Sequence, residues 1–224
     1  MRKIQPLEVN KHYSQKLRMD KTKYLKSPCR VSSIPYWKAK TISVPNGMCI
    51  VHHDEFSASM LENYTDEPYF RLYHTLENIK EPMLPCGFLL CDAATNTYAQ
   101  HINSCYDDIG VSESELKEYT KRKVYMPALW IAVKHLESNE IVATGIAEFE
   151  KEIGEGILEW IQVSKDLRRC GLATYLVQEL LYRMKDFAKF ATVSGKCKDA
   201  SCPEYLYRKC GFTGTDVWHV LRSK

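Results

Sequence analysis

This chain of 224 residues has no long apolar segment and few of the residues that mark fibrous or low-complexity proteins. No stretch approaches the ~18 consecutive apolar residues that a membrane-spanning helix needs, so no membrane partner is expected. With 10 Gly and 9 Pro, collagen-like and low-complexity architectures are excluded. Residues 1–6 are followed by no apolar run, and we therefore expect no secretory signal and a cytoplasmic location.

A disulfide framework is not expected either, although the chain has nine cysteines. Their number is odd, and without a secretory signal reduced thiols are the default. The most suggestive spacing, Cys197, Cys202 and Cys210, lacks the tight pairs and the fourth ligand of a structural zinc site, so we expect no metal. Cys170 has no flanking His–Asp pattern, which argues against covalent catalysis by its thiol.

Charge is distributed unevenly along the chain, despite a net charge of only +3. Residues 1–40 hold 11 Lys and Arg against 2 acids, a net +9, and the remainder holds 20 against 26, a net −6. Aromatic residues among the basic ones could stack on bases. Since no nucleic-acid-binding motif accompanies them, nucleic acid is not the expected partner. We interpret the difference as a domain boundary, with the basic arm packed on an acidic body.

Apolar patterns predict a mixed α/β fold in which one crossover helix joins neighbouring strands. An amphipathic helix is expected over residues 172–187, a short helix from Pro203, and a capping box at residues 112–115. Strands are expected over residues 41–44, 48–51, 87–91, 129–136, 141–149, 157–163, 190–194 and 217–221.

The N-terminal third is less regular. Pro68, with the spacing of Leu72, Leu76 and Ile79, predicts a helix over residues 68–79. Residues 81–85 are typical of a linker, and Asp92 is expected to cap the helix that follows. We therefore divide the chain into an N-terminal extension of unknown role, residues 1–86, and a body, residues 87–224.

The stretch that indicates chemistry is residues 163–173, where a predicted strand ends, a loop follows and a helix begins. The first N–H groups of a helix are unpaired and carry partial positive charge, which suits a phosphate. Gly171 allows a ligand close to the backbone, and Arg168 and Arg169 add positive charge. We therefore expect a phosphate-binding loop.

Two motifs in this body resemble those of the GNAT acetyltransferase superfamily. Arg168-x-x-Gly171-x-Ala173 is similar to its acyl-coenzyme A signature, Arg/Gln-x-x-Gly-x-Gly/Ala. Residues 205–212, Tyr-Leu-Tyr-Arg-Lys-Cys-Gly-Phe, are similar to its Tyr-x-x-x-Gly-Phe ending of the last helix. The expected strands and helices lie between the two motifs, which makes the match specific, and it covers residues 87–224.

The resemblance implies a fold and an activity. The fold is a mixed, mostly antiparallel central sheet flanked by helices. The activity is transfer of an acetyl group from acetyl-coenzyme A to the amine of a small molecule or protein, by direct attack in a ternary complex. The alternative function is a non-catalytic sensor or scaffold that binds acyl-coenzyme A on the same fold. Assembly as a homodimer is compatible with either function.

The resemblance also implies where coenzyme A would bind. Its pantetheine arm would pair with the backbone of Ile161 and Val163, and the Val163 amide would stabilise the oxyanion. The family's asparagine is replaced by Ala200, so Asp199 or Ser201 would have to supply that polar contact. The pyrophosphate would lie on the amides of Arg168, Arg169, Cys170, Gly171, Leu172 and Ala173, with Thr174 just inside the helix.

Two proton transfers accompany such a reaction, because an amine arrives protonated at neutral pH and the thiolate leaves. Tyr207 lies four residues before Gly211, where the family often has its acid tyrosine, so the resemblance implies Tyr207 as the general acid. For the base, strand alternation places Glu159 on one face with Ile161 and Val163, among apolar neighbours that would raise the pKa of its carboxyl. The alternatives are Glu148 and His219.

Residues 137–159 carry seven glutamates and one lysine, Lys151. This run is either the solvated surface of a hairpin or a negative rim that attracts a cationic amine.

Overall fold

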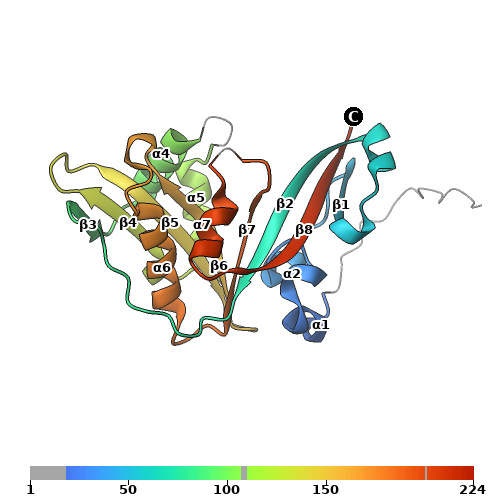
Figure 1. Cartoon of the computed structure of the whole chain (residues 1–224), viewed down its shortest axis with the longest axis horizontal. Coiled ribbons are helices and arrows are strands. Elements are labelled where there is room, and N and C mark those ends of the chain that lie inside the picture. Colours follow the sequence, from blue (N-terminus) through green and yellow to red (C-terminus); the bar gives the residue numbers. More distant parts are fainter. Residues whose placement is uncertain (1–18, 107–109, 200) are drawn as a thin grey trace, which may run out of the picture.

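The computed structural model describes residues 19–106, 110–199 and 201–224. Its centre is an eight-stranded sheet in the order β1-β8-β2-β7-β6-β5-β4-β3, with helices on its faces (Figure 1). Neighbouring strands are antiparallel except β6 and β7, which are parallel. The expected fold class is therefore confirmed. The strands are β1 (Met48–His52), β2 (Tyr64–His74), β3 (Phe88–Cys91), β4 (Trp130–His135), β5 (Ile141–Glu150), β6 (Glu155–Val163), β7 (Phe190–Lys196) and β8 (Thr213–Ser223).

The helices divide between the two faces of the sheet because side chains alternate along β4 and β5. Ile131 packs in one apolar cluster with α6 (Leu172–Met184). The neighbouring Trp130 packs in a second cluster with α4 (Thr95–Cys105) and α5 (Glu113–Tyr119). The other helical elements are α1 (Lys21–Lys26), α2 (Pro28–Val31), α3 (Tyr36–Ala39), η1 (His53–Glu55), η2 (Ala58–Glu62), η3 (Pro127–Leu129), η4 (Lys165–Leu167) and α7 (Pro203–Lys209).

The predicted helix over residues 68–79 is wrong, because this segment belongs to β2 and the loop that follows it. Pro68, Phe70, Leu72 and His74 are buried at every second position, which is the period of a strand. Leu76, which appeared to continue a helical spacing, has a φ of 62° in the loop. The spacing of Leu72, Leu76 and Ile79 therefore resembled a helix only because β2 ends between the first two of these residues.

Two smaller expectations are also wrong, whereas several local signals hold. Residues 41–44 form no strand, and Ala94 rather than Asp92 is the N-cap of α4. The capping box is confirmed, since Ser112 and Glu115 cap α5 reciprocally. The predicted β4–β5 hairpin and the start of α6 after Gly171 are confirmed as well.

The N-terminal third contributes to the same sheet. β2 lies between β8 and β7, so residues before position 86 are hydrogen-bonded to both C-terminal strands. The boundary at residue 86 falls in the loop from β2 to β3. The division into residues 1–86 and 87–224 as separate units stays a prediction.

The described part of the basic arm packs on the acidic strands, as the charge distribution indicated. Lys38 Nζ lies 2.6 Å from a carboxylate oxygen of Glu159, and Lys40 Nζ lies 2.5 Å from Glu152. Lys21 also pairs with Glu152, at 3.6 Å. Three glutamates of the run over residues 137–159, Glu150, Glu152 and Glu159, therefore form ion pairs with lysines of the arm.

A buried ion pair joins this arm to the centre of the sheet. Glu155 is fully buried on β6, and Arg71 on β2 is 1% exposed. Arg71 Nη2 lies 3.3 Å from Glu155 Oε1, which also accepts hydrogen bonds from Tyr24 Oη and Thr192 Oγ1, each at 2.7 Å. The Tyr36 amide donates to Glu155 Oε2 at 3.0 Å. This carboxylate thus connects α1, α3, β2, β6 and β7.

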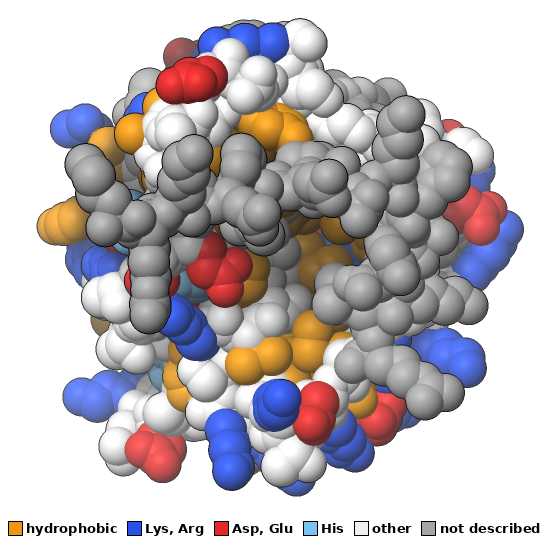
Figure 2. Space-filling view, turned by 90° about the vertical axis from the view of Figure 1, so that its right-hand side faces the viewer, with side chains coloured by type: hydrophobic (Ala, Val, Ile, Leu, Met, Phe, Trp, Pro, Cys, Tyr) orange, Lys and Arg blue, Asp and Glu red, His pale blue; other side chains and the backbone are white. Residues whose placement is uncertain are grey.

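Figure 2 shows the end of the molecule that carries β1 and β8. Apolar side chains gather in the middle of this face, and acidic side chains stand between the basic ones around them (Figure 2). Among the described residues, this face therefore presents charges of both signs.

Candidate active site

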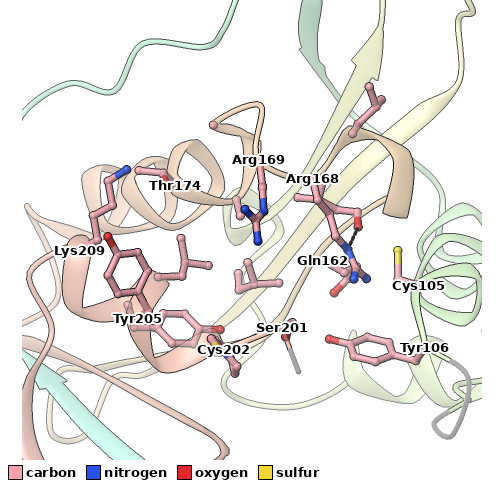
Figure 3. Close-up of a pocket in the computed structure, with 18 residues that line it drawn as sticks. Cys105, Tyr106, Gln162, Arg168, Arg169, Thr174, Ser201, Cys202, Tyr205 and Lys209 are labelled. Carbon is pink, nitrogen blue, oxygen red and sulfur yellow. Dashed lines mark hydrogen bonds between the residues drawn. The ribbon is translucent and has the colours of Figure 1, made fainter. Parts of the chain in front are cut away.

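The gap between β6 and β7 forms the candidate site. The two strands pair with each other only from Glu155 opposite Phe190 to Leu158 opposite Val193, and beyond this point they no longer pair with each other. A cavity of about 700 Å³ opens beside this divergence, between β6, the start of α6 and α7 (Figure 3). It is lined by Cys105, Tyr106, Ile161, Gln162, Val163, Leu167, Arg168, Arg169, Gly171, Ala173, Thr174, Ser201, Cys202, Pro203, Tyr205, Leu206, Tyr207 and Lys209.

The free edge of β6 presents backbone groups to this cavity. The Ser164 amide donates to the Val142 carbonyl of the neighbouring chain segment at 2.9 Å. In an antiparallel ladder, hydrogen-bonded and non-hydrogen-bonded positions alternate. Ile161 and Val163 therefore direct their N–H and C=O groups away from β5, and Arg168 Nε donates to the Val163 carbonyl at 3.4 Å. An extended ligand can add to β6 along this edge.

The start of α6 forms the other wall. Gly171 is the N-cap residue with a φ of 85°, and no side chain caps this end of the helix. The first N–H groups of the helix consequently have no partner within it. Arg168 and Arg169 also line the cavity, in which Figure 3 shows their guanidinium groups. Unpaired amides beside two cations suit a phosphate group.

Most residues predicted to bind coenzyme A lie together at the cavity, and two do not line it. The side chain of Leu172 is buried in the core, and Cys170 is exposed. Cys170 nevertheless lies in the loop that connects β6 to α6, and Leu172 is the first residue of α6. The lining residues among those predicted are Ile161, Val163, Arg168, Arg169, Gly171, Ala173 and Thr174. Contact of all nine residues with coenzyme A stays a prediction.

Tyr207 lies on α7 and lines the cavity from the β7 side. Its ring packs between those of Phe70 and Phe212, with centroids 6.1 and 5.8 Å away. Burial raises the pKa of the Tyr207 phenol above its ordinary value. The hydroxyl is therefore protonated at neutral pH, as a general acid must be, and this role stays a prediction.

Glu159 occupies a β-bulge, which the sequence pattern did not reveal. Trp160 pairs with Ile146 and Leu158 pairs with Ala147, so Glu159 has no residue opposite it on β5. The bulge breaks the alternation that was expected to place Glu159 on one face with Ile161 and Val163. Its carboxylate does not line the cavity, and Lys38 contacts it.

The two alternative bases, Glu148 and His219, lie on β5 and β8. Glu148 on β5 is 2% exposed and accepts hydrogen bonds from Trp37 Nε1 at 2.9 Å and Arg122 Nη1 at 2.7 Å. Burial raises the pKa of its carboxyl, and the neighbouring Glu159 raises it further. His219 lies on β8, which β2 and β7 separate from β6, and its Nδ1 is 2.9 Å from Asp66. Neither residue lines the cavity.

The cavity also contains polar residues that the motifs did not include. Tyr106 follows α4, and Lys209 ends α7 (Figure 3). Gln162 Nε2 donates to Thr144 Oγ1, whereas its Oε1 is buried and has no hydrogen-bond partner among the described residues. The sequence signal that could have indicated Gln162 is its polar amide side chain between two apolar residues, Ile161 and Val163. No linear signal relates Tyr106 to the loop, because tertiary folding brings them together.

The loop before α7 supplies a further polar group. Ala200, the position of the family's asparagine, lies outside the described residues. Ser201 lines the cavity, and its hydroxyl donates to Asp199 Oδ1 at 2.6 Å. Contact of Asp199 or Ser201 with coenzyme A stays a prediction.

Replacing Gly171 by valine is expected to weaken acetyl-coenzyme A binding by at least about tenfold, since a β-branched residue disfavours this φ and would distort the amide cradle. Isothermal titration calorimetry measures this. Gly87→Val is the matched control, because Gly87 has a φ of 89° with open space around it and does not line the cavity. Equal affinity of the Gly171 variant and wild type would contradict a role of this loop.

Neither a metal cluster nor a membrane span was found in the described part of the chain. Cys197 and Cys202 are exposed and Cys210 is buried, and no group of three or more potential ligands comes together among the described residues. None of the helices in residues 19–106, 110–199 and 201–224 has the length and apolar character required to span a bilayer.

Comparison with known proteins agrees with this geometry. Residues 127–214 match the family described as acetyltransferase (GNAT) domain. These residues include the β5–β6 hairpin, the loop, α6 and α7. Residues 127–214 are therefore similar to a GNAT acetyltransferase domain, in agreement with the resemblance seen in the two motifs. No curated protein sequence matches the chain significantly.

Solved structures share the fold at low sequence identity. A GCN5-related N-acetyltransferase from Sphaerobacter thermophilus has a TM-score of 0.66 and 18% identity, over 79% of this chain and 58% of that one. An acetyltransferase of the GNAT family from Colwellia psychrerythraea has a TM-score of 0.55 and 14% identity, over 84% and 69%. A tandem GNAT protein from the clavulanic acid biosynthesis pathway has a TM-score of 0.55 and 10% identity, over 73% and 56%. The chain thus spans less than two thirds of the first and third of these structures.

Proposed function

We propose that this protein is a cytoplasmic N-acetyltransferase that transfers an acetyl group from acetyl-coenzyme A to the amine of a small molecule or a protein. The observation that carries the proposal is the cavity at the divergence of β6 and β7, where an open strand edge meets the uncapped start of α6. A strand edge and a helix N-terminus suit the two ends of one elongated ligand, an amide-containing arm and a pyrophosphate.

In this proposal, each wall of the cavity has a role. Acetyl-coenzyme A is the substrate and supplies an activated acyl thioester. The amides of residues 168–174 hold its pyrophosphate, with the side chains of Arg168 and Arg169 neutralising the charge. The backbone of Ile161 and Val163 pairs with the pantetheine amides and directs an N–H toward the oxyanion. The Tyr207 hydroxyl protonates the departing thiolate.

Thermal shift with acetyl-coenzyme A and thiol release over a panel of amines together test the proposal. A ligand at about 100 times its Kd stabilises the folded state by about 2.7 kcal/mol. We expect acetyl-coenzyme A at this concentration to raise the Tm by an amount that corresponds to this free energy. Thiol release with at least one amine then supports catalysis. Stabilisation without thiol release would favour the non-catalytic acyl-coenzyme A sensor, and no stabilisation would contradict both functions.

A further inference from the structure

The short helix α3 is held on β5 and β6 by polar contacts to three glutamates. The Tyr36 amide donates to Glu155, and the Trp37 indole donates to Glu148. Lys38 follows, with its Nζ 2.6 Å from Glu159 Oε1, and both side chains are largely shielded, at 20% and 16% exposure. The segment thus places one primary amine in a defined position against the sheet.

That position is the point where β6 and β7 separate. The last β6–β7 pair is Leu158 with Val193, so Glu159 is the first residue of β6 beyond the pairing. It also forms the bulge, and Ile161, two residues later, lines the cavity. Lys38 therefore holds its ammonium group at the carboxylate of the first β6 residue beyond the pairing, two residues before Ile161 of the cavity lining.

Two other arm lysines are placed differently and provide a comparison. Lys40, immediately after α3, and Lys21 both pair with Glu152. Glu152 lies in the turn between β5 and β6, at the end of β6 opposite to the cavity. Lys21 and Lys40 therefore belong to the same basic arm as Lys38 and also pair with a glutamate, but their partner lies farther from the divergence of β6 and β7 than Glu159 does.

We propose that Lys38 is an internal acceptor, so that the protein acetylates its own Lys38 Nζ, and this inference rests on the proposed function. Glu159 accepts one proton from the ammonium group, and the neutral amine attacks the thioester carbonyl carbon. A C–N bond forms, the C–S bond breaks, and the second amine proton passes to the thiolate. The products are an amide on Lys38 and free coenzyme A, with one proton left on Glu159.

The consequence for the site is a change of charge. Acetylation removes the positive charge of Lys38 and its ion pair with Glu159. The carboxylate is then available to an external amine. Self-acetylation would therefore convert a chain whose acceptor position is filled by its own lysine into one that accepts other amines.

Incubation of the full-length chain with acetyl-coenzyme A, followed by peptide mass spectrometry, tests the inference. Lys38 is expected to be acetylated at least about tenfold faster than Lys21 and Lys40, because its amine is pre-positioned. The fraction modified per unit time should be independent of protein concentration, as for an intramolecular step. Lys38→Arg keeps a cation beside Glu159 and should lose the modification at this position without a compensating gain at Lys40.

Three outcomes would overturn the inference alone, and a fourth would overturn it together with the proposed function. Equal labelling of Lys21, Lys38 and Lys40 would indicate unassisted chemical acetylation. A rate that rises with protein concentration would indicate transfer between molecules. An unmodified Lys38 in a protein that releases thiol with an added amine would refute the internal acceptor and leave the proposed function intact. Absence of both acetyl-coenzyme A stabilisation and thiol release would instead refute the proposed function, and the inference with it.

Discussion

Replacing Tyr207 by phenylalanine is expected to lower kcat by about 100-fold, the low end of the contribution of a positioned general acid. In the proposed reaction, the Tyr207 hydroxyl donates the proton to the departing thiolate, and the variant lacks this hydroxyl. The ring packing against Phe70 and Phe212 is retained in the variant. Steady-state kinetics with the best amine of the panel measure kcat, and calorimetry measures the Kd for acetyl-coenzyme A.

The affinity for acetyl-coenzyme A should remain within about twofold of wild type, since Tyr207 acts on the leaving group in the transition state and not on the bound substrate. Tyr182→Phe on α6 is the control, because Tyr182 does not line the cavity. An unchanged kcat in the Tyr207 variant would remove the acid assignment. A parallel loss of binding would assign Tyr207 to substrate binding.

Replacing Glu155 by alanine is expected to lower the free energy of unfolding by about 3–5 kcal/mol, because it leaves Arg71 charged and buried without its partner. Arg71 is 1% exposed, and Glu155 also accepts hydrogen bonds from Tyr24, Tyr36 and Thr192. Urea unfolding followed by fluorescence measures the change. Since whole domains are stable by only 5–15 kcal/mol, such a loss is a large part of the total.

The control for this variant is Glu118→Ala. In the wild type the Glu118 carboxylate forms an exposed ion pair with Lys121, so its removal should not measurably change the free energy of unfolding. A double variant, Glu155→Leu with Arg71→Met, should recover much of the loss, because it removes both buried charges together. A loss below about 1 kcal/mol in Glu155→Ala would contradict the view that this ion pair joins the N-terminal arm to the sheet.

Local signals in the sequence predicted much of the body and of the candidate loop. The capping box at Ser112, the amphipathic pattern of α6 and the glycine before it act over a few residues, so a linear reading is sufficient. The same holds for the two motifs that resemble the GNAT family, since each lies within one strand–loop–helix or helix–turn segment.

Features that depend on pairing between distant segments could not be predicted in this way. Residues 68–79, which include much of β2, were expected to form a helix because Leu72, Leu76 and Ile79 have helical spacing. The pairing of β2 with β7 and β8 is decided by residues more than a hundred positions away. The bulge at Glu159 depends on the register with β5. The contact of Lys38 with Glu159 spans 121 positions, and only the opposite charges of the two segments indicated it.

A crystal structure of the protein with acetyl-coenzyme A tests the central claim most directly. We predict that the pyrophosphate lies on the amides of residues 168–174, that the pantetheine arm runs along Ile161 and Val163, and that the thioester is directed toward the divergence of β6 and β7. Coenzyme A bound elsewhere, or with its pyrophosphate away from the start of α6, would contradict it.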